Sequence, residues 1–158
     1  MRVPQAPIHG DLTVIRPASE RDIDLLVAWH VDPEVARSWD WETFTGDEML
    51  QRLTRSDVDP YIVLELGQPI GYLQTWLDGD APDERGLDMF LTPAARNRGL
   101  GPDAARALAR WLLTAGGVSR VTVDPHASNE RGVRAWTQAG FRIVERRHPD
   151  HHHPRRGS

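Results

Sequence analysis

The chain has 158 residues, of which 39% are apolar and 27% charged, a composition that fits one globular domain able to bury a core. It contains no cysteine, and all 19 basic residues are arginine. These absences exclude a thiol nucleophile, a thiolate zinc site, a lysine Schiff base and the lysine-dependent Walker phosphate loop. No run approaches the ~20 apolar residues of a membrane span, and the first residues show no secretory pattern, so we expect a cytoplasmic protein.

Charge is unevenly distributed along the chain. Residues 142–158 carry five arginines and two acidic residues, a balance of +3, so the overall charge of −4 leaves −7 for residues 1–141. An acidic body argues against nucleic acid as a partner, because binding to phosphates requires basic surface. It would attract a cationic substrate, although a solvated acidic surface with no such role explains the charge equally well.

Patterning in the first third predicts one strand followed by helices. Residues 12–15 are strand-like, and Ser19 with Asp22 forms a capping box for a helix in which apolar residues recur at helical spacing. The further elements expected in this part are a short helix over 33–38, a loop over 39–44 and a helix over 46–55.

The remainder alternates between strands and helices. The expected elements, in chain order, are strands 60–66 and 69–77 joined by a tight turn at 67–68, a polar loop over 78–85, strand 86–91, helix 102–115, strand 118–123, helix 129–138 and strand 141–144. This order predicts an α/β (α+β) fold with a mixed central sheet flanked by helices on both faces. We expect a single domain over 1–147 and a disordered tail over 148–158, and we assign the histidines of that tail no metal site.

One short segment points to a ligand. Arg96-Asn97-Arg98-Gly99-Leu100-Gly101 precedes the helix expected from Pro102, and the first turn of a helix presents unpaired N–H groups and the positive end of a dipole. Glycines lack a Cβ and allow close approach of the backbone, so the segment favours a phosphate-bearing ligand. Alone the pattern is weak, and the dinucleotide fingerprint is not met because residue 104 is alanine.

Three segments together resemble the GNAT acetyltransferases. They are Arg96-x-x-Gly99-x-Gly101, Asn129-x-x-Gly132-x-x-x-Trp136-x-x-x-Gly140-Phe141, and the strand Gly86–Leu91, and they occur in family order and spacing. The resemblance implies the GNAT fold and acetyl-CoA as co-substrate, with no metal. The acetyl-CoA-binding residues that it implies are Phe90, Leu91, Thr92, Arg96, Asn97, Arg98, Gly99, Leu100, Gly101, Pro102, Asn129 and Trp136.

Within that superfamily the chain resembles the aminoglycoside 6′-N-acetyltransferases. The segments that carry this likeness are Pro60-Tyr61-Ile62, Gly71-Tyr72-Leu73-Gln74, Arg85-Gly86-Leu87-Asp88, Asp124-Pro125-x-x-Ser128-Asn129 and the loop with Trp39 and Trp41. The resemblance implies acetylation of a polycationic primary amine, with Trp39, Asp40, Asp88 and Asp124 as substrate-binding residues. Taken one at a time, the tryptophans are equally ordinary as core residues and the acids as surface residues.

The chemistry of acetyl transfer gives these positions roles. An ammonium must lose a proton before it attacks a thioester, and Asp88 could hold it and accept that proton as the catalytic residue. Backbone N–H groups near Phe90 and Leu91 could polarise the thioester carbonyl, and Leu91 and Thr92 could pair with the pantetheine arm. The alternative for Asp88 is an exposed strand residue with no role.

Two departures from the family pattern leave alternatives open. Trp136 stands where the family often has a tyrosine acid, and indole is no proton source near neutral pH. Only the tail follows the segment at 141–147, after which members of the family normally have one more strand, so an exposed edge could pair in a homodimer; the expected state is monomer or homodimer. The alternatives are a GNAT enzyme for a siderophore hydroxylysine, a polyamine or a protein N-terminus, and a non-catalytic acyl-CoA-binding domain.

Overall fold

The protein is described by a computed structural model that covers residues 4, 6–33, 45–78 and 81–123. Within these ranges no helix is both long enough and apolar enough to cross a bilayer. The expected elements at 33–38, 129–138 and 141–144 and the tail at 148–158 lie, wholly or nearly so, outside the described residues.

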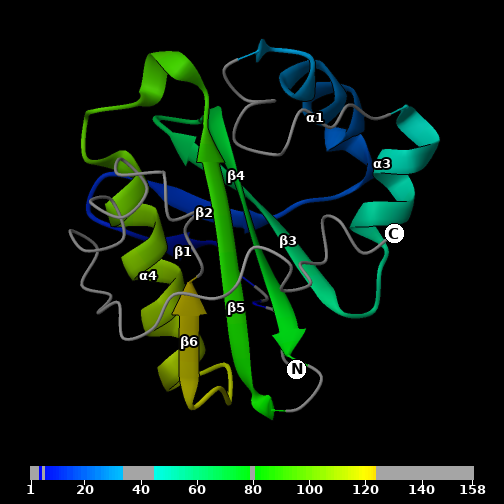
Figure 1. Cartoon of the computed structure of the whole chain (residues 1–158). Coiled ribbons are helices and arrows are strands. Elements are labelled where there is room, and N and C mark those ends of the chain that lie inside the picture. Colours follow the sequence, from blue (N-terminus) through cyan, green and yellow to red (C-terminus); the bar gives the residue numbers. More distant parts are fainter. Residues whose placement is uncertain (1–3, 5, 34–44, 79–80, 124–158) are drawn as a thin grey trace.

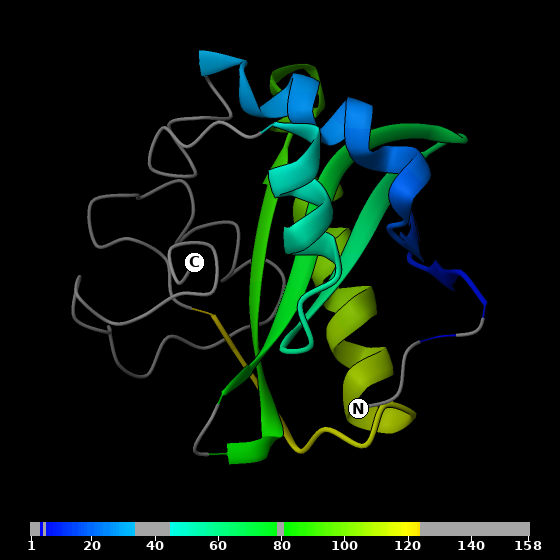
Figure 2. The ribbon, with the colours of Figure 1, turned by 90° about the vertical axis from the view of Figure 1, so that its right-hand side faces the viewer.

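A six-stranded sheet forms the centre of the described chain, with its strands side by side in chain order (Figure 1). The strands are β1 (Ile8–His9), β2 (Val14–Pro17), β3 (Val58–Glu65), β4 (Gln68–Asp78), β5 (Ala81–Leu91) and β6 (Arg120–Val123). All neighbours are antiparallel except β5 and β6, which run parallel, so the prediction of a mixed sheet is confirmed. The turned view in Figure 2 shows the strong twist of the long strands.

Helices cover both faces of the sheet, as predicted. In Figure 1, α1 (Ile23–His30) and α3 (Gly46–Leu53) lie to the right of the strands and α4 (Leu100–Thr114) to the left. Two short 3-10 helices, η1 (Glu20–Asp22) and η2 (Pro93–Ala95), precede α1 and α4. Apolar residues at alternating positions of β3, β4 and β5 therefore enter two cores. The core under α4 includes Tyr61, Leu73, Leu87 and Leu108, and the core under α1 and α3 includes Leu26, Met49, Ile62, Tyr72 and Phe90.

Some predicted boundaries were wrong. The prediction of a polar loop over 78–85 was wrong, because Asp78 belongs to β4, and residues 81–85 belong to β5, which pairs with β4 and then with β6. Pairing on both edges outweighs the weak strand propensity of this polar segment. The β3–β4 turn lies at Leu66-Gly67 rather than 67–68, with φ of 50° and 81°, as a tight hairpin of this kind requires. Strand β1 was not predicted.

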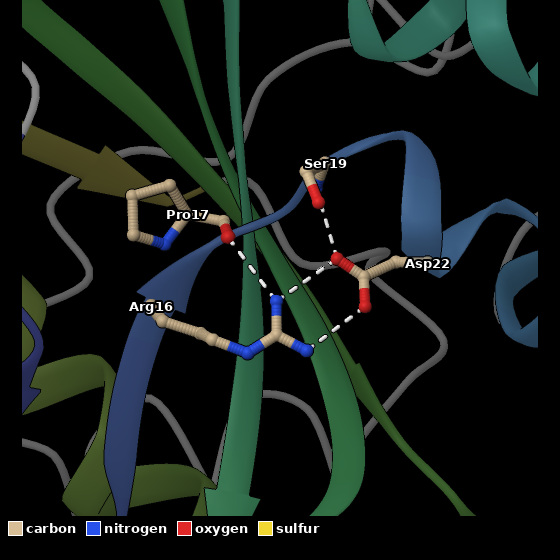
Figure 3. Close-up of polar contacts among 4 residues, drawn as sticks. All are labelled: Arg16, Pro17, Ser19 and Asp22. Carbon is tan, nitrogen blue, oxygen red and sulfur yellow. Dashed lines mark hydrogen bonds and ion pairs between the residues drawn. The ribbon is translucent and has the colours of Figure 1, made fainter.

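A partly buried ion pair fixes the entry into α1. Figure 3 shows the guanidinium of Arg16, on β2, against both carboxylate oxygens of Asp22, with N···O distances of 2.8 and 2.9 Å. The backbone N–H of Ser19 also donates to Asp22, as the predicted capping box requires. Burial alone would raise the pKa of Asp22, but these donors and the nearby arginine charges outweigh it, so that pKa lies below its ordinary value.

A second buried carboxylate joins the N-terminal hairpin to α4. Asp103, in the first turn of α4, accepts hydrogen bonds from the N–H groups of Asp11, Leu12 and Thr13 at 2.9–3.0 Å and from the Thr13 hydroxyl at 2.7 Å. Gly10 belongs to the same turn, where a Cβ would collide with the Asp103 carboxylate. The β1–β2 turn therefore holds the beginning of α4, and with it the Arg96–Gly101 segment, against the sheet.

We predict that Asp103→Asn lowers the free energy of unfolding by about 2–3 kcal/mol. Asparagine replaces one carboxylate oxygen with an NH₂ group, which faces the N–H donors of the β1–β2 turn and leaves them without an acceptor. Urea unfolding with an unchanged m-value measures the loss. The control is Asp47→Asn, which removes an exposed acid from the first turn of α3 and should cost less than about 1 kcal/mol. Equal losses in the two variants would contradict this role for Asp103.

A second prediction concerns pH. Because the folded-state pKa of Asp22 is lowered, its ion pair stabilises the protein above the unfolded-state pKa of about 3.9 and loses that effect as pH falls through the folded value. The free energy of unfolding of wild type should exceed that of Asp22→Asn by about 2 kcal/mol at neutral pH, and this difference should shrink below about pH 4. Asp24→Asn, which alters an exposed residue of α1, should follow wild type. A difference for Asp22→Asn that stays constant down to about pH 2 would refute the linkage.

Candidate active site

Strand β5 presents a different kind of side chain to each face of the sheet. Leu87, Met89 and Leu91 pack on the core under α4, whereas Phe90 enters the core under α1 and α3. Successive strand residues point to opposite faces, so Asp88 lies on the same side as Phe90. Asp88 is buried. The predicted catalytic carboxylate thus lies on the face covered by α1 and α3.

The edge of β5 that faces β6 is only half covered by the described chain. The β5–β6 ladder runs from Glu84↔Arg120 to Leu87↔Val123, and in Figure 1 the β6 arrow ends beside the middle of β5. The backbone N–H of Thr92 donates to the carbonyl of Ile70 at 2.9 Å, which directs alternate backbone groups of β5 toward β4. By alternation, the N–H groups of Met89 and Leu91 point to the other edge. Opposite them the described residues place no strand.

The residues that we expected to contact acetyl-CoA through their backbone differ in whether their N–H groups are already bonded within the chain. Thr92 uses both backbone groups within the chain, since its carbonyl also accepts from the N–H of Ala95 at 3.0 Å. The carbonyl of Leu91 accepts a hydrogen bond from the Arg96 side chain at 3.2 Å. The outward-pointing N–H groups therefore belong to Leu91 and to Met89, the second of which the sequence analysis did not include.

A chain of buried polar groups reaches Asp88 from β4. The hydroxyl of Tyr72 donates to Oε1 of Gln74 at 2.9 Å, and Nε2 of Gln74 lies 3.4 Å from Oδ2 of Asp88. Burial and the negative charge of Asp88 raise the pKa of Tyr72 against the opposing effect of Arg52, so the hydroxyl stays protonated. Tyr72 and Gln74 were not predicted as functional residues.

Aromatic rings from α1 surround Phe90 on the same face. The rings of Trp29 and His30 meet Phe90 edge-on, with centroids 5.8 and 5.3 Å away. Burial lowers the pKa of His30 despite its hydrogen bond to the carbonyl of Leu26, and the charge of Arg52 lowers it further. His30 is therefore neutral at neutral pH, and its Nδ1–H donates to Leu26 at 2.7 Å. Nearer the start of β5, a Cβ on Gly86 would collide with the Trp76 indole, so the absence of a side chain at Gly86 allows the indole to pack over it.

The Arg96–Gly101 segment leads from the end of β5 into α4. Asn97 and Gly99 have positive φ values of 64° and 76°, and Gly99 is the N-cap of α4, where no side chain of the described residues caps the helix. A Cβ on Gly99 would meet nothing within 4 Å, whereas one on Gly101 would lie 3.0 Å from Met89. Gly101 thus lets α4 pack on β5, and Gly99 shapes an uncapped, exposed helix start. Such a start suits an anion.

One of the two arginines beside this helix start already forms an ion pair within the protein. Arg98 forms an ion pair with Glu65 at the end of β3, with an N···O distance of 2.6 Å, and about half of the Arg98 side chain is exposed. Arg96 is half-buried and Pro102 takes a place in the first turn of α4. The predicted residues of this segment therefore lie together at one end of β5, next to its uncovered edge. Trp39, Asp40, Asp124, Asn129 and Trp136 lie outside the described residues.

Comparison with known proteins gives the same family for most of the chain. A family described as an acetyltransferase (GNAT) domain matches residues 18–148. The chain is 30% identical to aminoglycoside N(6′)-acetyltransferase type 1 of Klebsiella pneumoniae over 150 residues, which cover 84% of this chain and 75% of that protein. A kanamycin resistance protein of Rhizobium radiobacter is 36% identical over 67 residues, or 42% of this chain and 62% of the relative.

Solved structures agree with the sequence matches. Aminoglycoside acetyltransferase AAC(6′)-Ib in complex with paromomycin and acetyl-CoA has a TM-score of 0.76 and 29% identity, over 84% of each chain. The same enzyme with coenzyme A and kanamycin has a TM-score of 0.74 and 29% identity, over 82% of this chain and 84% of that chain. RimL, a ribosomal L7/L12 α-N-protein acetyltransferase, shares the fold at 13% identity and a TM-score of 0.74, over 86% of this chain and 84% of that chain. The chain belongs to the GNAT acetyltransferase family.

Proposed function

We propose that this protein transfers the acetyl group of acetyl-CoA to the 6′-amino group of an aminoglycoside. The observation that carries the proposal is the arrangement on β5: a buried carboxylate on one face, two outward-pointing N–H groups on the uncovered edge, and an uncapped helix start just beyond. The similarity to aminoglycoside N(6′)-acetyltransferase type 1 supports the choice of acceptor.

Acetyl-CoA binds, in this proposal, along the uncovered edge of β5 with its pyrophosphate at the start of α4. The exposed, left-handed Gly99 leaves room for the phosphates, and the first-turn N–H groups of α4 and the arginines of the segment supply donors and positive charge. We include Asn129 and Trp136 in the proposed acetyl-CoA site on the basis of the family resemblance alone. The pantetheine arm lies beside Met89 and Leu91, whose N–H groups have no strand opposite them within residues 81–123, and these groups pair with the arm or with the thioester carbonyl.

Asp88 acts as the base. The acceptor ammonium first loses a proton to the Asp88 carboxylate, and the neutral amine attacks the thioester carbonyl. The N–C bond forms, an N–H of β5 stabilises the negative oxygen, and the C–S bond then breaks. The attacking nitrogen releases its second proton to solvent, and Asp88 returns the proton that it accepted to solvent. The departing CoA thiolate, whose conjugate thiol has a pKa of ~8.5 in the free state, takes a proton from solvent.

The acceptor is a polycation held by carboxylates. The acidic excess of the chain outside residues 142–158 favours a cationic ligand, and the proposed acceptor contacts are Asp88, Trp39, Asp40 and Asp124. Trp39 would stack on a sugar ring or cation. The rings of Trp29 and His30, which contact Phe90, lie on the same face of β5 as Asp88.

We predict that Gly99→Asp weakens acetyl-CoA binding at least about tenfold, because it adds a negative charge where the pyrophosphate lies. Gly99→Asn is the matched control, since asparagine has the same shape and also tolerates a positive φ. Isothermal titration with CoA measures both affinities. If the two variants bind CoA equally, the pyrophosphate does not lie at Gly99.

A second prediction tests the base and the acceptor together. With kanamycin as acceptor, CoA release followed by a thiol reagent should fall at least about 100-fold in Asp88→Asn, while CoA affinity is retained. Wild-type rates across a panel of an aminoglycoside, a polyamine and an N-terminal peptide identify the acceptor class. Turnover with another amine alone would replace the aminoglycoside proposal, and normal turnover of Asp88→Asn would remove Asp88 as the base.

A further inference from the structure

The polar chain that reaches Asp88 is built by the register of β4 on β5. Tyr72 lies opposite Phe90, and Gln74 lies opposite Asp88. Tyr72 and Gln74 are two residues apart on one strand, so their side chains share a face and can reach each other. The hairpin thus places an amide directly beside the proposed base and a phenol directly beside the amide.

The hydrogen bonds of this chain have a fixed direction. The Tyr72 hydroxyl has one proton and donates it to Oε1 of Gln74 at 2.9 Å. The amide must then turn its NH₂ toward Asp88, where Nε2 and Oδ2 are 3.4 Å apart. The reversed amide would set Oε1 against the carboxylate, acceptor against acceptor. The orientation that Tyr72 enforces therefore favours an Asp88 oxygen without a proton, which is the state that a base needs.

Burial makes this control effective. Gln74 is 0% exposed and Tyr72 is 2% exposed, so water cannot easily replace a lost partner. Among the described residues, His30 of α1 and Arg52 of α3 also bring titratable or charged side chains close to Tyr72 and Phe90 on this face. The distance of 3.4 Å between Gln74 and Asp88 is long for a hydrogen bond, so we expect the effect of Gln74 on Asp88 to be modest in size.

We propose that Tyr72 and Gln74 are positioning residues for Asp88, in which the tyrosine hydroxyl fixes the Gln74 amide so that its NH₂ faces the catalytic carboxylate. This inference rests on the proposed role of Asp88 as the base. It assigns the two residues no contact with either substrate. Their effect is on the orientation and the proton occupancy of Asp88.

The test compares the loss of one buried phenolic hydroxyl on each face of the sheet. Tyr72→Phe breaks the chain, whereas Tyr61→Phe removes a hydroxyl that is buried in the core under α4 and has no hydrogen-bond partner among the described residues. We expect Tyr72→Phe to lower kcat about 3- to 10-fold and to move the acidic limb of the kcat–pH profile up by about half a unit to one unit. The KM for acetyl-CoA should stay unchanged, and Tyr61→Phe should match wild type throughout.

Gln74→Leu provides a second route to the same answer, since it should reproduce the shift of the acidic limb without altering Tyr72. The double variant Tyr72→Phe/Gln74→Leu should be no worse than Gln74→Leu alone, because both changes act through one carboxylate. An unshifted acidic limb in both single variants, or additive losses in the double variant, would overturn the positioning role. The assay uses whichever amine wild type acetylates, so failure with kanamycin alone counts against the aminoglycoside proposal and leaves this test standing.

Discussion

The asymmetric pairing of β5 is the constraint on which the rest of the site depends. One edge of β5 is joined to β4 from Asp78↔Ala81 to Gly71↔Leu91, whereas the ladder to β6 ends at Leu87↔Val123. The paired edge fixes the strand as a rigid support. On the other edge, the backbone N–H groups of Met89 and Leu91 have no strand opposite them among the described residues, and it is there that we propose acetyl-CoA to bind. Because side chains alternate along residues 88–91, Asp88 and Phe90 lie on one face of β5, whereas Met89 and Leu91 pack against the apolar core on the other face.

Two buried carboxylates outside the site hold this support in place. Asp22 fixes the entry of α1, whose last turn brings Trp29 and His30 against Phe90. Asp103 holds the first turn of α4 to the N-terminal hairpin and so places the exposed Gly99 next to the end of β5. The two helices therefore reach β5 from opposite faces, and each is anchored by a carboxylate that accepts several hydrogen bonds.

The sequence predicted the fold class and most of the described elements because their signals are local. The Ser19–Asp22 capping box, the apolar periods of the helices and the glycine-bounded strands all have short-range causes. The register between β4 and β5 is not local. A regular hairpin closed at residues 79–80 would set Gln74 opposite Arg85, but the irregularity between Leu77 and Asp78 shifts the pairing by three residues and sets it opposite Asp88. The polar chain from Tyr72 was therefore invisible to patterning, as was the difference between the exposed Gly99 and the buried Gly101.

Amide hydrogen exchange of β5, measured by NMR with and without CoA, tests the central claim most directly. The N–H of Thr92 is already bonded to Ile70, and Phe90 lies opposite Tyr72 in the β4 ladder. We expect CoA to slow exchange at Met89 or Leu91, or at both, while Phe90 and Thr92 remain protected in both states. CoA that binds without changing exchange at Met89 and Leu91 would contradict the account, because the uncovered edge of β5 would then play no part in holding the donor.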